Sequence, residues 1–341
     1  SIRPGCGWQE RPILMDGLTK GIANADYHGS DELSRSTASS LLTTSPAKVR
    51  WERENPRPSS SALVMGGCFH SMVLEPECLD EEYAVKPTEI DGKSPLTKYY
   101  KETFAEMQAE RPDAQWLKPD EWKTCLGMAE AVLSNPVYTH YASDIDAIAE
   151  GTGYFDYNGA KCKVRPDLYT SDGTIIDLKS TQDASEAGFR KSVRNFGYDF
   201  QTAWYMEAMR ALGLPAKQFI FVCVEKSAPY LTATYTLTAS EIDRQKPRMQ
   251  KACEIWATCM ESGVWPGYPE EVVTLDLSRF GDNHKLSLSQ VAEKFGVSRT
   301  FVYTIIKEYE LETTNVGNQR RVDLTAFSNA LRNHNEGKKA A

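Results

Sequence analysis

Hydrophobic positions recur at helical spacing over much of the chain, with polar residues between them. The predicted helices cover 36–49, 62–74, 98–134 (two amphipathic helices), 184–195, 200–212 and 239–262. The first of these should stop at Pro46, because proline cannot continue a helix. Stretches rich in Pro, Gly and Ser at 53–61 and 86–97 indicate loops, and residues 1–30 show no clear period, which indicates an irregular arm.

The middle of the chain changes to the alternation of strands. Strands are predicted at 145–157, 160–169, 174–179, 217–226 and 232–237. Asn158-Gly159 is a strong hairpin signal between the first two strands, and 171–173 (SDG) turns the chain into the third. We therefore expect the first three strands to form an antiparallel meander, with helices on either side of the strand region in the sequence.

Composition excludes several classes of protein. The 341 residues are 41% apolar and 25% charged, which is ordinary for a globular protein. No apolar run approaches the length of a membrane span, and the first residues lack a signal-peptide pattern, so a cytoplasmic location is expected. The eight cysteines include no C-x-x-C pair, which argues against a zinc site and favours scattered reduced thiols.

The charge is unevenly distributed. The chain carries a net charge of −8. Residues 284–341 hold nine Lys and Arg against six Asp and Glu, or +3, whereas the remainder holds 30 against 41, or −11. An overall negative charge leaves room for a nuclease, since a metal site needs clustered carboxylates and a basic track can be local.

Two aspartates and a lysine in the middle region indicate phosphodiester chemistry. An Arg-Pro-Asp triplet ending at Asp167 is followed after nine residues by Asp-Leu-Lys at 177–179. Carboxylates suit Mg²⁺, and a neighbouring lysine can position or deprotonate the attacking water. Asp177 and Lys179 share one strand face, and the predicted turn brings Asp167 alongside Asp177. Leu178 points to the core, but its carbonyl can face the metal.

Four other residues strengthen this interpretation, although each has a simpler alternative. His70 lies on an apolar helix, where a histidine is more often a core residue than a ligand. Glu150 precedes the hairpin and is either a third carboxylate of the cluster or an exposed strand acid. Gln201 and Tyr205 share a helix face and either contact phosphate or bases, or form the polar edge of an amphipathic helix.

The order G-x-x-x-H, strand acid, R-P-D, D-x-K and Q-x-x-x-Y resembles the PD-(D/E)xK nucleases of the RecB type. A closer resemblance, over roughly residues 22–280, is to the RecE (exonuclease VIII) type. It rests on 24–28 (NADYH), 45–47 (SPA), 67–76 (GCFHSMVLEP), 165–167 (RPD) and 265–266 (WP). Iron–sulfur members of a sister group carry a further cysteine where this chain has Gln250, so a cluster is not expected.

The resemblance implies a restriction-endonuclease-like α/β core, a central mixed sheet with flanking helices. It makes Lys179 the catalytic lysine, and it makes Gln201 and Tyr205 the residues that organise the substrate. The implied metal ligands are His70, Glu150, Asp167, Asp177 and the carbonyl of Leu178. Arg165, Gln201 and Tyr205 are the implied DNA contacts of this core.

The resemblance also implies an activity and partners. Such enzymes use Mg²⁺, with Mn²⁺ as a substitute, and degrade one strand of linear double-stranded DNA from its 5′ end. The 3′ overhang is then used by a single-strand annealing protein in recombination, typically in phages and prophages. A ring-shaped homo-oligomer through which DNA passes is implied as well.

The C-terminal stretch 286–311 predicts a helix-turn-helix. Its apolar positions fit two short helices, with Gly296 at the turn and Ser298 capping the second helix. Residues 315–322 can form a small wing. The expected DNA contacts on the second helix are Arg299, Thr300 and Tyr303. The alternative is a module for packing or protein interaction that reuses this fold.

The predicted organisation is an arm at 1–21, a nuclease domain at 22–283, a small helical helix-turn-helix domain at 284–335 and a polar tail at 336–341. The leading function is an exonuclease on linear duplex DNA. Alternatives are a structure-specific endonuclease or nickase with the same core, and a catalytically inactive DNA-binding regulator. Asp167, Asp177 and Lys179 argue against the regulator, because a binding protein has no need of mutually repelling buried carboxylates.

Overall fold

The computed structural model describes residues 14–273, apart from 16 and 57, and residues 285–339, apart from 317 and 318. The chain divides into two compact units, residues 1–268 and 269–341. The domain boundary expected at 283 falls among residues 274–284, outside the described part. No helix of the described residues is both long and apolar enough to cross a membrane.

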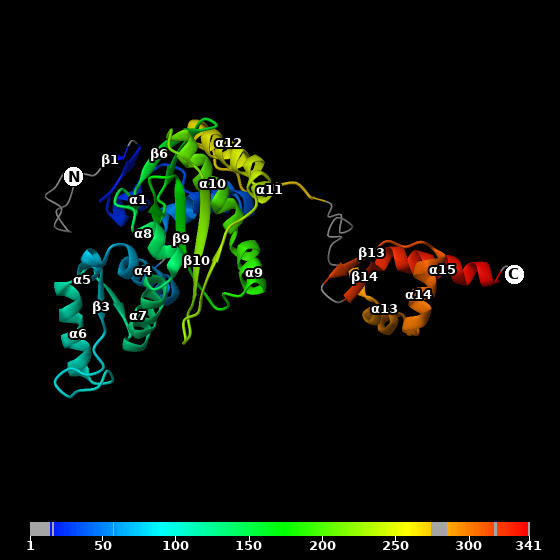
Figure 1. The fold of residues 1–341 in the computed structure, drawn as a ribbon, viewed down its shortest axis with the longest axis horizontal. Helices are drawn as coiled ribbons and strands as arrows, with labels where there is room; N and C mark the ends of the chain where they lie inside the picture. Colours follow the sequence, from blue (N-terminus) through cyan, green and yellow to red (C-terminus); the bar gives the residue numbers. More distant parts are fainter. Residues whose placement is uncertain (1–13, 16, 57, 274–284, 317–318, 340–341) are drawn as a thin grey trace. The chain divides into compact units, whose positions relative to one another are not determined.

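A mixed five-stranded sheet forms the centre of the first unit (Figure 1). Its strands, in spatial order, are β11 (Thr232–Tyr235), β10 (Gln218–Glu225), β9 (Thr174–Thr181), β8 (Leu168–Tyr169) and β5 (Ile148–Ala149). Strands β9 and β10 are parallel, and all other neighbours are antiparallel. The expected central mixed sheet is thereby confirmed.

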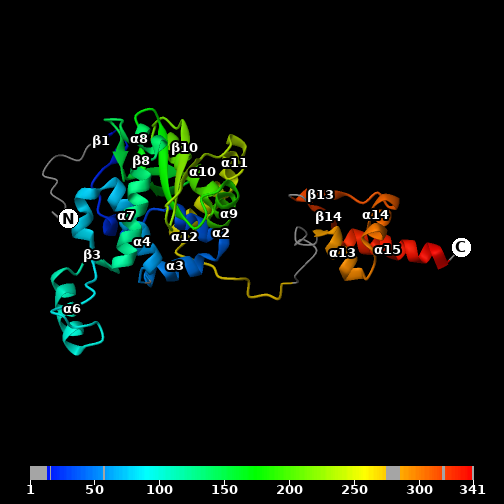
Figure 2. The ribbon, with the colours of Figure 1, turned by 60° about the horizontal axis from the view of Figure 1, so that its bottom comes forward.

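Helices cover both faces of this sheet (Figures 1 and 2). One core contains side chains of α2 (Arg35–Thr43), α9 (Glu186–Phe196), α10 (Tyr198–Ala211) and α12 (Lys246–Ser262), and the other those of α4 (Ser61–Leu74), α7 (Pro119–Leu133) and α8 (Pro136–Ala142). Successive side chains of β9 alternate between the two cores, as in any strand that is covered on both faces. Ile175 packs in the first core, whereas Ile176 and Leu178 pack in the second.

Smaller elements surround these layers. They are β1 (Leu14–Met15), β2 (Leu18–Thr19), α1 (Asn24–Gly29), α3 (Pro46–Glu54), η1 (Pro76–Cys78), α5 (Leu79–Glu82), β3 (Tyr83–Val85), α6 (Lys98–Glu110), β4 (Gln115–Leu117), β6 (Gly153–Tyr157), β7 (Ala160–Val164) and α11 (Ala239–Asp243). The β1–β2 pair and α1 show that the irregular arm expected at 1–30 was wrong for residues 14–15, 18–19 and 24–29; residues 1–13 and 16 lie outside the description.

The expected three-stranded meander was wrong in its pairing. The Asn158-Gly159 hairpin is present, with positive φ at both residues, and joins β6 to β7. These strands form a sheet of their own, however, while β8 pairs with β9. The ladder is interrupted at 165–167, where Pro166 has no amide hydrogen to donate to a neighbouring strand.

Two predicted helices are each divided in two. Helix α2 ends at Thr43, and Pro46 begins α3 instead of stopping a helix, because proline is well tolerated in the first turn. Helix α3 then continues to Glu54, into the predicted loop. The long helix expected at 239–262 breaks between α11 and α12, next to Pro247 in the first turn of α12.

The second unit has its own hydrophobic core, which includes Val291, Ile305 and Phe327. Its elements are β12 (Lys285–Ser287), α13 (Leu288–Phe295), α14 (Arg299–Glu308), β13 (Thr313–Val316), β14 (Gln319–Asp323) and α15 (Leu324–Lys339). The two expected short helices are present, with Gly296 at the turn in left-handed conformation. The unit also contains a three-stranded sheet, and α15 continues through residues expected to be a polar tail.

Candidate active site

The centre of the site is one face of strand β9. Asp177 and Lys179 point to the same face, and the side chain of Asp177 is only 1% exposed. Oδ1 of Asp177 accepts a hydrogen bond of 2.6 Å from Nε2 of Gln201 on α10. Oδ2 forms an ion pair with the Lys179 ammonium but accepts no regular hydrogen bond. One oxygen of this buried carboxylate therefore keeps coordinating capacity.

Asp167 directly precedes β8, the strand next to β9 in the sheet. Strand β8 pairs with β9 through Leu168↔Ile176, so each aspartate directly adjoins a residue of this pair. The Leu178 amide donates a hydrogen bond of 2.6 Å to Oδ2 of Asp167. In a strand the N–H and C=O of one residue leave on the same side, so the Leu178 carbonyl also faces the side of Asp167.

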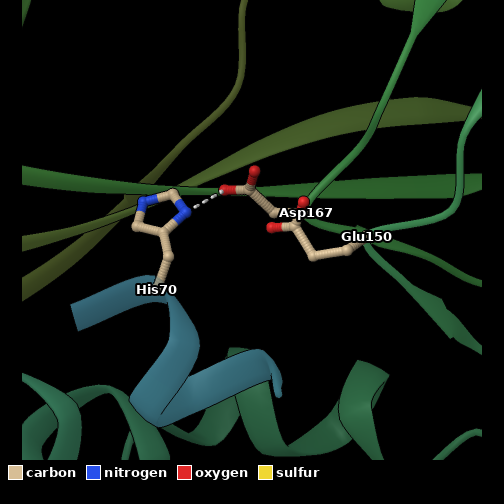
Figure 3. Close-up of side chains that lie close together, drawn as sticks. All are labelled: His70, Glu150 and Asp167. Carbon is tan, nitrogen blue, oxygen red and sulfur yellow. Dashed lines mark ion pairs between the residues drawn. The ribbon is translucent and has the colours of Figure 1, made fainter. Parts of the chain in front are cut away.

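Glu150 and His70 complete an acidic cluster around Asp167 (Figure 3). Ligand atoms of His70, Glu150 and Asp167 all lie within 4.8 Å of one another. Nδ1 of His70, on α4, is 3.5 Å from Oδ2 of Asp167. Glu150 follows β5 with a φ of 51°, unusual for a side-chain-bearing residue, and its amide donates a 3.1 Å hydrogen bond to the Asp167 carbonyl.

Glycine follows Glu150 for a steric reason. A Cβ atom at Gly151 would lie 2.6 Å from Cγ2 of Ile148, closer than real Cβ contacts allow. The small residue lets the chain turn tightly after β5 and carry the Glu150 carboxylate toward Asp167. The backbone of Glu150 is thus held in an uncommon conformation by its surroundings.

The donor set fits a divalent cation. One imidazole nitrogen and carboxylate oxygens, as His70, Glu150 and Asp167 provide, are ligands for Mg²⁺ or Mn²⁺. Burial raises the pKa of Glu150 well above its ordinary value, and the Asp167 charge adds to this effect. Burial likewise raises the pKa of Asp177, although Lys179 opposes it. A bound cation would relieve both penalties.

The structure thus brings together only some of the predicted ligands. The three-residue group contains His70, Glu150 and Asp167, whereas Asp177 is engaged by Lys179 and Gln201. The spacing of the two aspartates in the sequence could not tell which of them joins His70 and Glu150 and which is held by Lys179 and Gln201.

Lys179 is held as a cation. Burial acts to lower its pKa, but the Asp177 and Asp167 carboxylates outweigh that effect and raise it above its ordinary value. Its ammonium also lies 4.9 Å from the ring centre of Tyr198, the first residue of α10. Gly197, with a φ of 64°, ends α9 and starts α10, and so places Tyr198 and Gln201 under β9.

The Q-x-x-x-Y residues make protein contacts that the sequence did not indicate. Gln201 joins Asp177 to Arg35 of α2, whose guanidinium donates a 3.2 Å hydrogen bond to Oε1 of the amide. The Tyr205 hydroxyl donates a 3.0 Å hydrogen bond to the Arg165 carbonyl, and burial raises its pKa well above the ordinary value. Arg35 was missed because nothing in its local pattern links it to residues so far along the chain.

Arg165, expected to contact DNA, is 8% exposed and bonded within the protein. Its guanidinium donates hydrogen bonds to Thr152, Asn24 and the carbonyl of Ile22. One N–H of each guanidinium nitrogen is therefore bonded within the protein, and the expected DNA contact of Arg165 stays a prediction.

In the second unit, Arg299, Thr300 and Tyr303 are exposed on α14, together with Thr304 and Lys307. Val302, Ile305 and Ile306 face the core of that unit, as the predicted apolar pattern requires.

Comparisons with known proteins agree with this geometry. The model of a family described as a PDDEXK-like domain of unknown function (DUF3799) matches residues 39–277. A crystal structure from Eubacterium rectale, of a protein provisionally named an exonuclease, aligns with a TM-score of 0.53 and 16% identity over 76% of this chain and 97% of that chain. This likeness supports the fold.

A phage related exonuclease from Haemophilus somnus aligns with a TM-score of 0.29 and 14% identity, over 58% of this chain and 95% of that chain, which is too low to carry an argument. No curated protein matches the sequence. The matched family segment includes every predicted site residue from His70 to Tyr205. The chain therefore belongs to the PDDEXK-like family (DUF3799), and its first unit is a metal-dependent nuclease domain of the PD-(D/E)xK type.

Proposed function

We propose that the protein is a Mg²⁺-dependent exodeoxyribonuclease that degrades linear double-stranded DNA from its 5′ ends. The observation that carries the proposal is the group of His70, Glu150 and Asp167, which the Leu178 amide links to the strand of the buried Asp177–Lys179 pair. This arrangement offers cation ligands and a fixed positive charge within a few ångströms, which is what phosphodiester hydrolysis requires.

A divalent cation held by His70, Glu150, Asp167, Asp177 and the Leu178 carbonyl would polarise the phosphate and lower the pKa of a bound water. The protein's own part is to hold these ligand atoms in fixed positions. Gln201 fixes the Asp177 carboxylate through one oxygen and leaves the other directed to Lys179.

Lys179 acts as an ammonium in this proposal. Because Asp177 and Asp167 raise its pKa, it stays protonated at neutral pH and serves better as a charge than as a base. It stabilises the negative charge that develops as the water oxygen bonds to phosphorus and the bond to the leaving oxygen breaks. The products are a phosphate-ended strand and a free hydroxyl.

The finer features rest on the resemblance to RecE-type nucleases and not on the geometry. They are the 5′-to-3′ direction, the 3′ overhang used in recombination by a single-strand annealing protein, the homo-oligomeric ring and a phage or prophage origin within a host cell. The similar structure from Eubacterium rectale is of a protein named as an exonuclease, which supports the exonuclease proposal in general terms.

We also propose that the second unit binds duplex DNA. The exposed face of α14 carries Arg299, Thr300, Tyr303, Thr304 and Lys307 and no acidic residue before Glu308. Helix and hairpin follow in the order of a winged helix, whose second helix enters the major groove. The alternative, an assembly module, uses the same core but needs no cationic face.

One assay tests the proposal. Linear duplex labelled at the 5′ or the 3′ end and closed circular duplex are incubated with Mg²⁺ or with EDTA, and product lengths are followed. Progressive loss of the 5′ label from linear DNA alone, only with Mg²⁺, is expected. Cleavage of the circle would instead indicate an endonuclease or nickase, and no cleavage of either would favour a DNA-binding protein.

A further inference from the structure

Three segments that are distant in the sequence meet at the guanidinium of Arg165. Nε donates a 2.8 Å hydrogen bond to Oγ1 of Thr152. Nη1 donates a 2.7 Å bond to Oδ1 of Asn24, and Nη2 a 2.8 Å bond to the carbonyl of Ile22. The guanidinium carbon lies 4.1 Å from the ring centre of Tyr27. Every nitrogen of the group therefore has a partner within the protein.

Two of these segments lead directly to proposed metal ligands. Arg165 precedes Asp167 by two residues, and Thr152 follows Glu150 by two. Thr152 is 1% exposed and is itself fixed by two 2.9 Å backbone hydrogen bonds with Thr19. The Arg165 carbonyl accepts the hydroxyl of Tyr205. Side chain and backbone of this arginine thus brace the stretches that carry two ligands.

Glu150 depends on such bracing because of its backbone. Its φ of 51° lies in the left-handed region, which a residue with a side chain adopts only when its surroundings enforce it. The amide of Glu150 donates to the carbonyl of Asp167, so the two ligand stretches move as one. Loss of the link to Thr152 would free the segment that follows this strained residue.

We propose that Arg165 is a positioning residue of the metal site, which holds Glu150 and Asp167 at ligand separation through Thr152 and the N-terminal segment. The proposal rests on the metal-dependent nuclease function proposed above. It replaces the role in DNA contact that the sequence suggested. Partners outside the ligand set commonly change metal affinity by about ten- to a hundredfold when they are removed.

Measuring metal binding in the absence of DNA distinguishes a positioning role of Arg165 from a role in DNA contact. Calorimetric titration with Mn²⁺ is made on the full chain and on its Arg165→Lys, Arg165→Met and Thr152→Val variants. Lysine keeps the charge but loses the forked donors, and valine removes only the hydroxyl acceptor. Arg53→Met is the matched control, because Arg53 also lies over an aromatic ring, 5.1 Å from that of Trp256, but forms its ion pair with Asp31, which is not a proposed ligand.

All three site variants should bind Mn²⁺ at least about tenfold more weakly than wild type, with duplex affinity in EDTA unchanged. The control should match wild type in both measurements. Unchanged Mn²⁺ affinity in Thr152→Val and Arg165→Lys would overturn the proposal. It would also be overturned if Arg165→Met bound duplex DNA more weakly than wild type while Arg165→Lys bound it normally.

Circular dichroism identifies any variant that fails to fold, and Thr152→Val still tests the link if Arg165→Met is such a variant. Failure of the wild type to bind Mn²⁺ would refute the proposed function together with this inference. Metal-dependent cleavage by the wild type with an unaltered metal affinity in every variant would refute the inference alone.

Discussion

The Asp177–Lys179 pair offers a quantitative test of the site's electrostatics. Replacing Lys179 by Met leaves a carboxylate that is 1% exposed without its counter-charge. Removing one partner of a buried pair typically costs about 3–5 kcal/mol in the free energy of unfolding. Because the Lys179 side chain keeps 15% of its surface exposed and Gln201 still bonds to Asp177, we expect the lower end, about 3 kcal/mol.

The loss should depend on pH in a defined direction. Burial raises the pKa of Asp177 above its unfolded value, and removing Lys179 raises it further. The folded protein then binds the proton more tightly than the unfolded chain does. The destabilisation is therefore complete above the raised pKa and fades as the pH falls through it. The Lys179→Met defect should be smaller in mildly acidic buffer than at about pH 8.

A second substitution in the same chain isolates the pair. Asp177→Asn needs no counter-charge, so the double variant should be less destabilised than the sum of the single variants, with a coupling of about 2 kcal/mol. All seven tryptophans lie between residues 8 and 265, so their fluorescence during urea unfolding in EDTA reports the nuclease unit alone. Single effects that add to within about 0.5 kcal/mol, or a defect that does not shrink on acidification, would refute the reasoning.

Three other outcomes are expected. His70→Ala should raise the Mg²⁺ midpoint of cleavage at least about tenfold with little change in Tm, since its side chain is 29% exposed; a lower Tm with an unchanged midpoint would make it a core histidine. Tyr205→Phe should cost about 1 kcal/mol in urea unfolding through its bond to Arg165 and leave duplex affinity unaltered, whereas weaker binding would restore its substrate role. Deleting residues 284–341 should preserve single-turnover cleavage at saturating DNA but lower the affinity for duplex DNA and make that affinity less dependent on salt. An unchanged affinity and salt dependence would exclude DNA binding by the second unit, and a changed oligomeric state would indicate that it is an assembly element.

The sequence by itself determined the residue types of the site and the face on which they lie. Asp177 and Lys179 are two apart in a strand, and the alternation of β9 sends Leu178 to the opposite core. The Asn158-Gly159 turn and the Ser298 cap of α14 could also be predicted from the sequence. Both depend on the backbone preferences of a few adjacent residues. Local periodicity encodes which side of an element is buried.

Tertiary structure alone decided which partner each polar group takes. Arg165 bonds to Asn24, 141 residues away, and Arg35 bonds to Gln201, 166 residues away. No local pattern specifies such pairs, because they follow from how helices and strands pack once the cores are formed. The same packing pairs Asp177 with Lys179 and places Asp167 with His70 and Glu150. The spacing of the two aspartates in the sequence was equally compatible with a metal-ligand role for each. Burial forces each polar group to find a hydrogen-bonding partner, and only the folded chain determines which partner is within reach.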